Sequence, residues 1–176
     1  TVKLEYRNVP KCELRAYRID LMKFSLLRQN LEAITQINLS GIRPLHEETI
    51  ELGDGKDYRD RERELKLPLD EEGAYLIVCR GENLHASGFE LISPLKLEVQ
   101  QDPVSGQVRT TLKNALDDKY VPNVHVKVIG TRDSDFKAGE TDLRGVFSAE
   151  PISGRATVIA QSTDHRYAFY RGETDL

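Results

Sequence analysis

Four histidines are the side chains best able to bind a metal ion or transfer a proton, and they lie far apart in the sequence: His46, His85, His125 and His165. Zinc sites usually draw on histidine or cysteine pairs at short spacing, and no His-x-His or His-x-x-x-His pair is present. The common nucleophile, metalloprotease, phosphate-loop and dinucleotide-binding patterns are also missing. We therefore predict no catalytic, cofactor-binding or metal-binding residues, and no enzyme activity.

Acidic residues offer two weaker candidates for chemistry. Asp133-Ser134-Asp135 places two carboxylates on one loop, but it lacks the glycine and the distal glutamate of a calcium-binding loop. The pairs Glu47-Glu48 and Glu71-Glu72 lie at expected turns or strand edges, where nothing would raise a carboxyl pKa. We interpret all of these residues as solvated surface groups.

The two cysteines, Cys12 and Cys79, fit neither a Cys-x-x-Cys redox pair nor a zinc site. The favoured interpretation is that both are small buried apolar side chains. A disulfide between them is the alternative, and it would be allowed in an oxidising compartment.

Composition excludes several classes of protein. The net charge of −4 gives no basic surplus for nucleic acid, and no apolar run approaches the roughly 18–20 residues of a membrane span. With 39% hydrophobic and 31% charged residues, the 176-residue chain can form cores for one large or two smaller domains. We expect it to be part of a longer protein.

The first half of the chain alternates apolar and polar residues, which is typical of half-buried strands. Val2, Leu4 and Tyr6 share one face, and a second strand over 12–19 changes parity, which predicts a bulge near Ala16. Residues 21–36 instead follow helical spacing, with Asp20 placed to cap the first turn.

Two later segments of this half differ in polarity: one is highly charged and the other is apolar. Lys56 to Glu64 is a dense run of mixed charge, which predicts a solvated loop or sheet edge. Ala74 to Cys79 is the most apolar β-rich run, which predicts a central strand buried on both faces.

Ser93-Pro94 predicts a domain boundary, because alternation restarts at once with Leu95, Leu97 and Val99. Further short strands follow at spacings of about 8–15 residues, which is typical of a β-sandwich. We predict an all-β fold of two tandem β-sandwich domains, 1–93 and 94–176, the first with a short helical insertion over about 21–36.

One local motif is more specific. In Thr141 to Phe147, Asp142 can accept hydrogen bonds from the backbone that follows it, Gly145 can supply a positive φ, and Phe147 returns to the core. This pattern predicts a hairpin. Upstream, Tyr120 to Val128 combines a proline turn with alternating valines.

The order of these pieces resembles the macroglobulin domains of the alpha-2-macroglobulin family, in particular its bacterial members. Leu14-Arg15-Ala16-Tyr17-Arg18-Ile19-Asp20-Leu21 is similar to a family strand that continues into a helical stretch. Leu65 to Leu69 followed by Gly73 to Val78 is similar to a family hairpin, and the passage from Ser87 to Leu95 also fits. The resemblance covers nearly the whole chain.

The resemblance implies a non-catalytic scaffold within a large protease-trapping protein in the periplasm, at the cell envelope or secreted. Its implied partners are neighbouring domains of the same protein and, through that protein, proteases. The family's thioester motif Cys-Gly-x-x-Gln is absent, because Cys12 precedes Glu13 and Cys79 precedes Arg80. The alternative function is a carbohydrate-binding or adhesive module, although the sequence contains no tryptophan.

Overall fold

The computed structural model describes residues 1–23, 39 and 41–176. Almost all regular structure in this part of the chain is β-strand, which confirms the all-β prediction. Residues 21–23 form a helical turn, and the Asp20 carboxylate accepts hydrogen bonds from the amides of Met22 and Lys23 at 3.0 and 3.1 Å, as expected of a cap. Apart from this first turn, the helix predicted over 21–36 lies outside the described residues.

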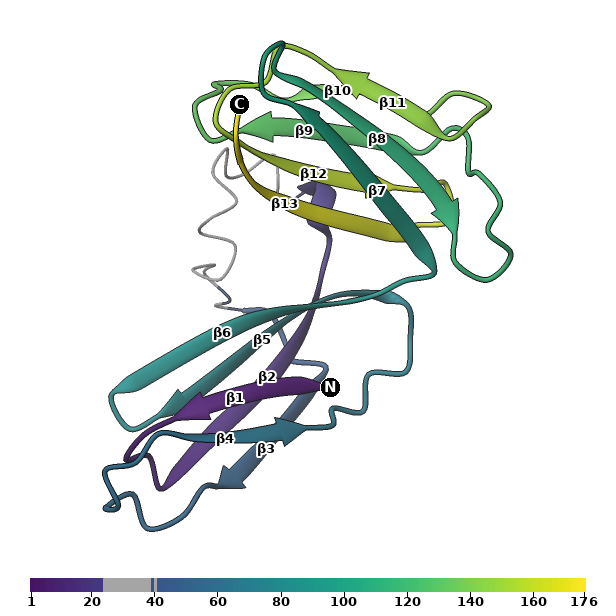
Figure 1. Ribbon diagram of the computed structural model, residues 1–176. Helices are drawn as coiled ribbons and strands as arrows, with labels where there is room; N and C mark the ends of the chain where they lie inside the picture. Colours follow the sequence, from purple (N-terminus) through teal and green to yellow (C-terminus); the bar gives the residue numbers. More distant parts are fainter. Residues whose placement is uncertain (24–38, 40) are drawn as a thin grey trace. The chain divides into compact units, whose positions relative to one another are not determined.

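The chain forms two compact units (Figure 1). The first contains Thr1–Ile19 and Thr35–Glu90, and the second contains Asp20–Ile34 and Leu91–Leu176. The division between residues 90 and 91 falls inside strand β6. The boundary that the sequence predicts between residues 93 and 94 stays a prediction.

The first unit has a sheet of two strands, β1-β4, and a sheet of four, in the order β3-β2-β5-β6. Its strands are β1 (Val2–Tyr6), β2 (Lys11–Ile19), β3 (His46–Glu51), β4 (Arg61–Leu65), β5 (Gly73–Gly81) and β6 (Leu84–Ile92). Leu4 and Leu65 from the smaller sheet join Leu14, Ile50 and Ile77 from the larger one in a single apolar core. The alternation predicted over residues 2–6 is therefore the core-facing pattern of β1.

Strand β2 is buried on both faces near its end. Cys12, Leu14 and Ala16 belong to the core, whereas Tyr17 and Ile19 are buried with the opposite parity. Pairing with β5 nevertheless runs without a break from Glu13↔Arg80 to Ile19↔Ala74. The bulge predicted near Ala16 is therefore wrong: the change of parity arises because a second face is covered.

Strand β5 lies between β2 and β6 within the larger sheet, which confirms the predicted central strand. Tyr75 and Leu76 are completely buried and Ile77 is 2% exposed, so both faces of the strand are covered. Val78 is only half-buried, less than the sequence predicts.

The charged run from Lys56 to Glu64 is a solvated segment, as predicted, and its last residues enter β4. In the two-stranded sheet β4 has only β1 as a neighbour, and Arg61 to Glu64 are all exposed. Lys3 of β1 pairs with Glu62 across the sheet, with 2.6 Å between Nζ and Oε2. Charged side chains on such an edge discourage pairing with foreign strands.

The second unit has a three-stranded sheet, β11-β8-β7, and a four-stranded sheet, β10-β9-β12-β13. Its strands are β7 (Leu95–Asp102), β8 (Gln107–Asn114), β9 (His125–Gly130), β10 (Lys137–Glu140), β11 (Val146–Ala149), β12 (Arg155–Gln161) and β13 (Tyr167–Asp175). Val108 and Leu112 from one sheet meet Val126, Val128 and Val158 from the other in one core. Of the alternating valines predicted here, Val126 and Val128 form the core-facing side of β9, and Val124, just before the strand, belongs to the same core.

The predicted hairpin at residues 141–147 is wrong in one respect. The strands on either side of it belong to different sheets, because β10 pairs with β9 and β11 pairs with β8. The motif is therefore a turn that carries the chain from one sheet to the other. Strand β10 was not predicted. Its sequence is Lys-Ala-Gly-Glu, which lacks the β-branched and aromatic residues that favour strands.

None of the helical structure described for this chain is long and apolar enough to cross a membrane.

Replacing Leu14 by alanine tests the core of the first unit. Leu14 is completely buried in β2, so we expect Leu14→Ala to lower the free energy of unfolding by about 2–5 kcal/mol through lost burial and a residual cavity. Chemical denaturation measures the change. Leu84→Ala is the control, because Leu84 is 64% exposed and its removal should change stability little. Equal effects of both variants would contradict the burial of β2.

Candidate functional site

The turn between β10 and β11 is held by the hydroxyl of Thr141, a residue that is 3% exposed. The hydroxyl donates to the carbonyl of Val121 at 2.8 Å and accepts from the amide of Val124 at 3.0 Å. The backbone of Thr141 also bonds to Asn123 and Val124. One buried side chain thus fixes the loop before β9 against the turn after β10.

Asp142 organises the rest of this turn. Its Oδ1 accepts from the amides of Arg144 and Val146, both at 2.9 Å, as the sequence predicts. The hydrogen bond from Val146, together with Arg144, lowers the pKa of the Asp142 carboxyl. Gly145 has a φ of 67°, and a Cβ there would lie 2.6 Å from the carbonyl oxygen of Leu112. Glycine is therefore required at this close approach to β8.

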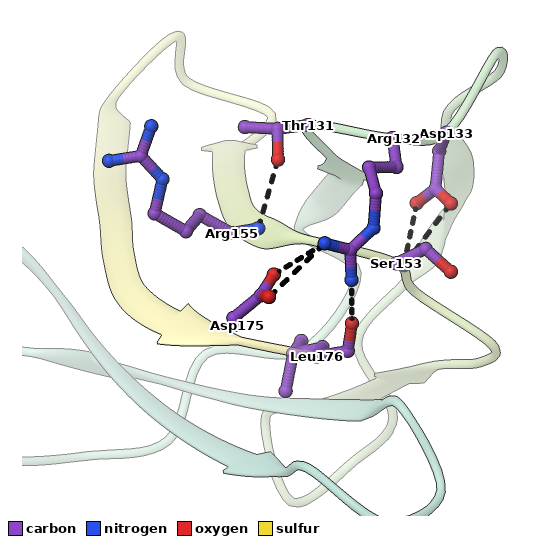
Figure 2. A network of polar contacts seen from close by, with 7 residues as sticks. All are labelled: Thr131, Arg132, Asp133, Ser153, Arg155, Asp175 and Leu176. Atoms are coloured by element: carbon purple, nitrogen blue, oxygen red, sulfur yellow. Dashed lines mark hydrogen bonds and ion pairs between the residues drawn. The ribbon is translucent and has the colours of Figure 1, made fainter.

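A second polar network surrounds Arg132, in the loop after β9 (Figure 2). The guanidinium donates from Nη1 to Asp175 Oδ1 at 2.8 Å and from Nη2 to the carbonyl of Leu176 at 2.6 Å. The backbones of Gly154 and Leu176 exchange hydrogen bonds at 3.0 and 3.2 Å. The network holds the last two residues against the start of β12.

The calcium candidate at Asp133 belongs to the same region. The Asp133 carboxylate accepts from the amide of Gly130 at 2.8 Å. It also accepts from the amide of Ser153 at 3.2 Å (Figure 2). Its oxygens therefore join the β9–β10 loop to the backbone at the end of β9 and in the segment between β11 and β12. Ser134 donates to Asp135 at 2.9 Å, and neither residue is buried.

The structure does not gather the histidines and paired glutamates into a site. His46 Nε2 lies 3.5 Å from Glu48 Oε1. His165 lies in the turn before β13, next to Gln161. Glu47 binds Arg15 at 2.8 Å, and Glu71 binds Arg18 at the same distance. Within residues 1–23, 39 and 41–176, no three histidine, cysteine, aspartate or glutamate side chains are grouped so as to hold a metal ion.

A pocket in the second unit also contains polar groups. Ser162, Asp164 and Arg166 line it together with Pro94, Leu95, Asn114, Val121, Pro122 and Thr163. Asp164 accepts a hydrogen bond from Ser162, which lowers the pKa of the carboxyl, and it pairs with Arg166 at 3.0 Å. These groups satisfy one another and stabilise the turn between β12 and β13.

Two solved structures with a similar fold are fragments of one bacterial protein. A crystal structure of native alpha-2-macroglobulin from Escherichia coli, spanning domains MG0-NIE-MG1, superposes with a TM-score of 0.71 at 12% identity. A second fragment of that protein, spanning NIE-MG1, gives a TM-score of 0.69 at 11% identity. The chain has a macroglobulin-type fold.

Coverage shows how far this likeness extends. Each match includes 96% of this chain, but the chain spans only 57% of the longer fragment and 86% of the shorter one. No protein-family model and no curated protein matches the sequence. The fold implied by the sequence resemblance is therefore confirmed over nearly the whole chain.

Three of the residues that organise these sites, Thr141, Arg132 and Asp175, were not predicted to do so. The sequence motif singled out Asp142, Gly145 and Phe147, but it assigned no role to the Thr141 hydroxyl. Its partners Val121 and Val124 lie 20 and 17 positions away. Arg132 and Asp175 are 43 positions apart, and no local pattern connects them.

Replacing Thr141 by valine tests the sheet-crossing turn. Valine has a similar shape but leaves the buried Val124 amide and Val121 carbonyl without their partner, so we expect Thr141→Val to cost about 1–3 kcal/mol. Thr141→Ser retains the hydroxyl and is the matched control. Chemical denaturation should rank serine above valine in stability. A valine variant as stable as the serine variant would show that these bonds contribute nothing.

Proposed function

We propose that this chain is a pair of non-catalytic scaffold domains within a larger alpha-2-macroglobulin-like protein. The observation that carries the proposal is the match of 96% of the chain to fragments of the Escherichia coli protein. Its domain order suggests a finer correspondence, because the chain spans 86% of a fragment described as NIE-MG1. By that order, the first unit would correspond to NIE and the second to MG1.

The use of polar side chains supports a structural role. The side chains of Thr141, Asp142 and Asp133 form hydrogen bonds with backbone groups. Arg132 binds Asp175 and a backbone carbonyl. Such groups stiffen loops, and none of these four side chains pairs a nucleophile with a base that would activate it, which is the arrangement covalent catalysis requires. The partners in this proposal are neighbouring domains of the same protein, and proteases would be met only through the whole protein.

An extracytoplasmic location also belongs to this proposal, since it follows from the relationship to a protease-trapping protein. The alternative of a carbohydrate-binding module has less support. Carbohydrate platforms usually present several aromatic side chains on one surface. Here the two most exposed tyrosines, Tyr58 and Tyr120, are 71% and 53% exposed and belong to different units.

The isolated chain should neither hydrolyse proteins nor capture proteases. Incubation with trypsin, chymotrypsin and subtilisin, followed by denaturing gels and size exclusion, measures both activities. We expect trypsin to cut the exposed loop at Arg59 without forming a complex. Arg59→Gln is the control, because it should remove that cut alone.

An active-site-blocked protease provides the second control. A stoichiometric complex that survives denaturation and forms only with the active protease would overturn the scaffold proposal. Cleavage of an added protein substrate by the chain itself would overturn it as well.

A further inference from the structure

The core of the first unit contains both cysteines of the protein, on two adjacent strands. Cys12 lies in β2 and Cys79 in β5, and both are free thiols. They are 4% and 9% exposed and belong to the same apolar cluster between the two sheets. Two thiols that are 67 positions apart in the sequence are thus brought onto one face of one sheet.

The strand register places the two cysteines as diagonal neighbours. Cys79 lies directly opposite Leu14, and Cys12 is two positions before Leu14 on the same face of β2. Diagonal neighbours in antiparallel strands have Cα atoms about 7–8 Å apart with closer side chains. Disulfides need Cα atoms within about 6.8 Å. Joining the two sulfurs therefore requires a shift of roughly 1 Å between the strands.

The position of the pair makes such a shift local. Cys12 lies just beyond Glu13↔Arg80, the last paired position between β2 and β5 at this end. Next to it is Gly81, where a Cβ would lie 3.8 Å from the Cβ of Cys12 and 2.5 Å from a methyl carbon of Val9. Because residue 81 has no side chain, Val9 can pack against this end of the core.

We propose that Cys12 and Cys79 form a redox-sensitive dithiol, which thiol–disulfide exchange with an external disulfide closes into a bond between β2 and β5. One thiolate attacks the external disulfide, forming a mixed disulfide and releasing one thiol. The second thiolate then attacks the protein sulfur of that mixed disulfide and releases the other thiol. Two S–H bonds of the protein are lost, one S–S bond forms, and the external disulfide accepts both electrons and both protons.

The environment of the thiols sets when this reaction takes place. Burial, with a smaller contribution from Cys12, raises the pKa of the Cys79 thiol to about 11, and burial also raises the pKa of the Cys12 thiol. Both are protonated at neutral pH, and the protonated form is not the nucleophile. Closure is therefore fast while the chain folds or when β2 and β5 separate, and slow in the closed core.

Refolding the full chain in a buffer of reduced and oxidised glutathione tests the proposal. We expect the product to have lost two hydrogen atoms in mass and to contain no thiol that reacts under denaturing conditions. Proteolysis should yield one linked pair of peptides containing Cys12 and Cys79. The oxidised chain should unfold at a higher denaturant concentration than the reduced chain, and dithiothreitol should reverse the difference.

Cys12→Ala and Cys79→Ala are the matched controls, and each should end as a glutathione adduct of the remaining cysteine. The oxidised wild-type chain supplies the decisive result even if neither variant folds. Two free thiols after refolding, or glutathione adducts on the wild-type protein without the linked peptide, would overturn the proposal.

Discussion

In each unit, the apolar face of one sheet is removed from water by the apolar face of another, and the chain must therefore pass between sheets. In the second unit this passage occurs in the turn between β10 and β11, where Thr141 and Asp142 satisfy backbone groups that no strand partner reaches. Buried backbone groups without partners are costly. The registers of β9 and β11, and hence the packing of their valines and Phe147, depend on this turn.

Residues that look chemically promising in the sequence have their polar atoms bonded to other groups of the protein in the same way. Asp133 has the carboxylate expected of a cation ligand, yet its oxygens accept amide hydrogens from Gly130 and Ser153. Arg132 holds the end of the chain through Asp175 and Leu176. The loops at this end of the second unit are thereby fixed in place, as the proposed scaffold role would require.

Alternation was the strongest signal in the sequence, and it correctly predicted β1 and β9, because each has one face in a core. Strand β5 was predicted instead from its unbroken apolar run. Alternation misled where a second face of a strand is covered, as at Tyr17 in β2. Apolar residues on both faces change the parity of the pattern, and this change was interpreted as a bulge. Alternation also failed for β10, whose place depends on pairing with β9 rather than on its own residues. The hydroxyl of Thr141 was not predicted, since its partners come together only when two distant loops meet.

Amide hydrogen exchange measured by NMR tests the central claim most directly, namely that side chains of the loops complete the backbone hydrogen bonding of a two-sheet scaffold. Val124 precedes β9 and its amide is bonded to the Thr141 hydroxyl, and the amide of Gly130 is bonded to the Asp133 carboxylate. We predict that both amides exchange as slowly as those in the middle of β9 and β12. Exchange of both as fast as the amide of Leu143, a residue that is 88% exposed, would contradict the account.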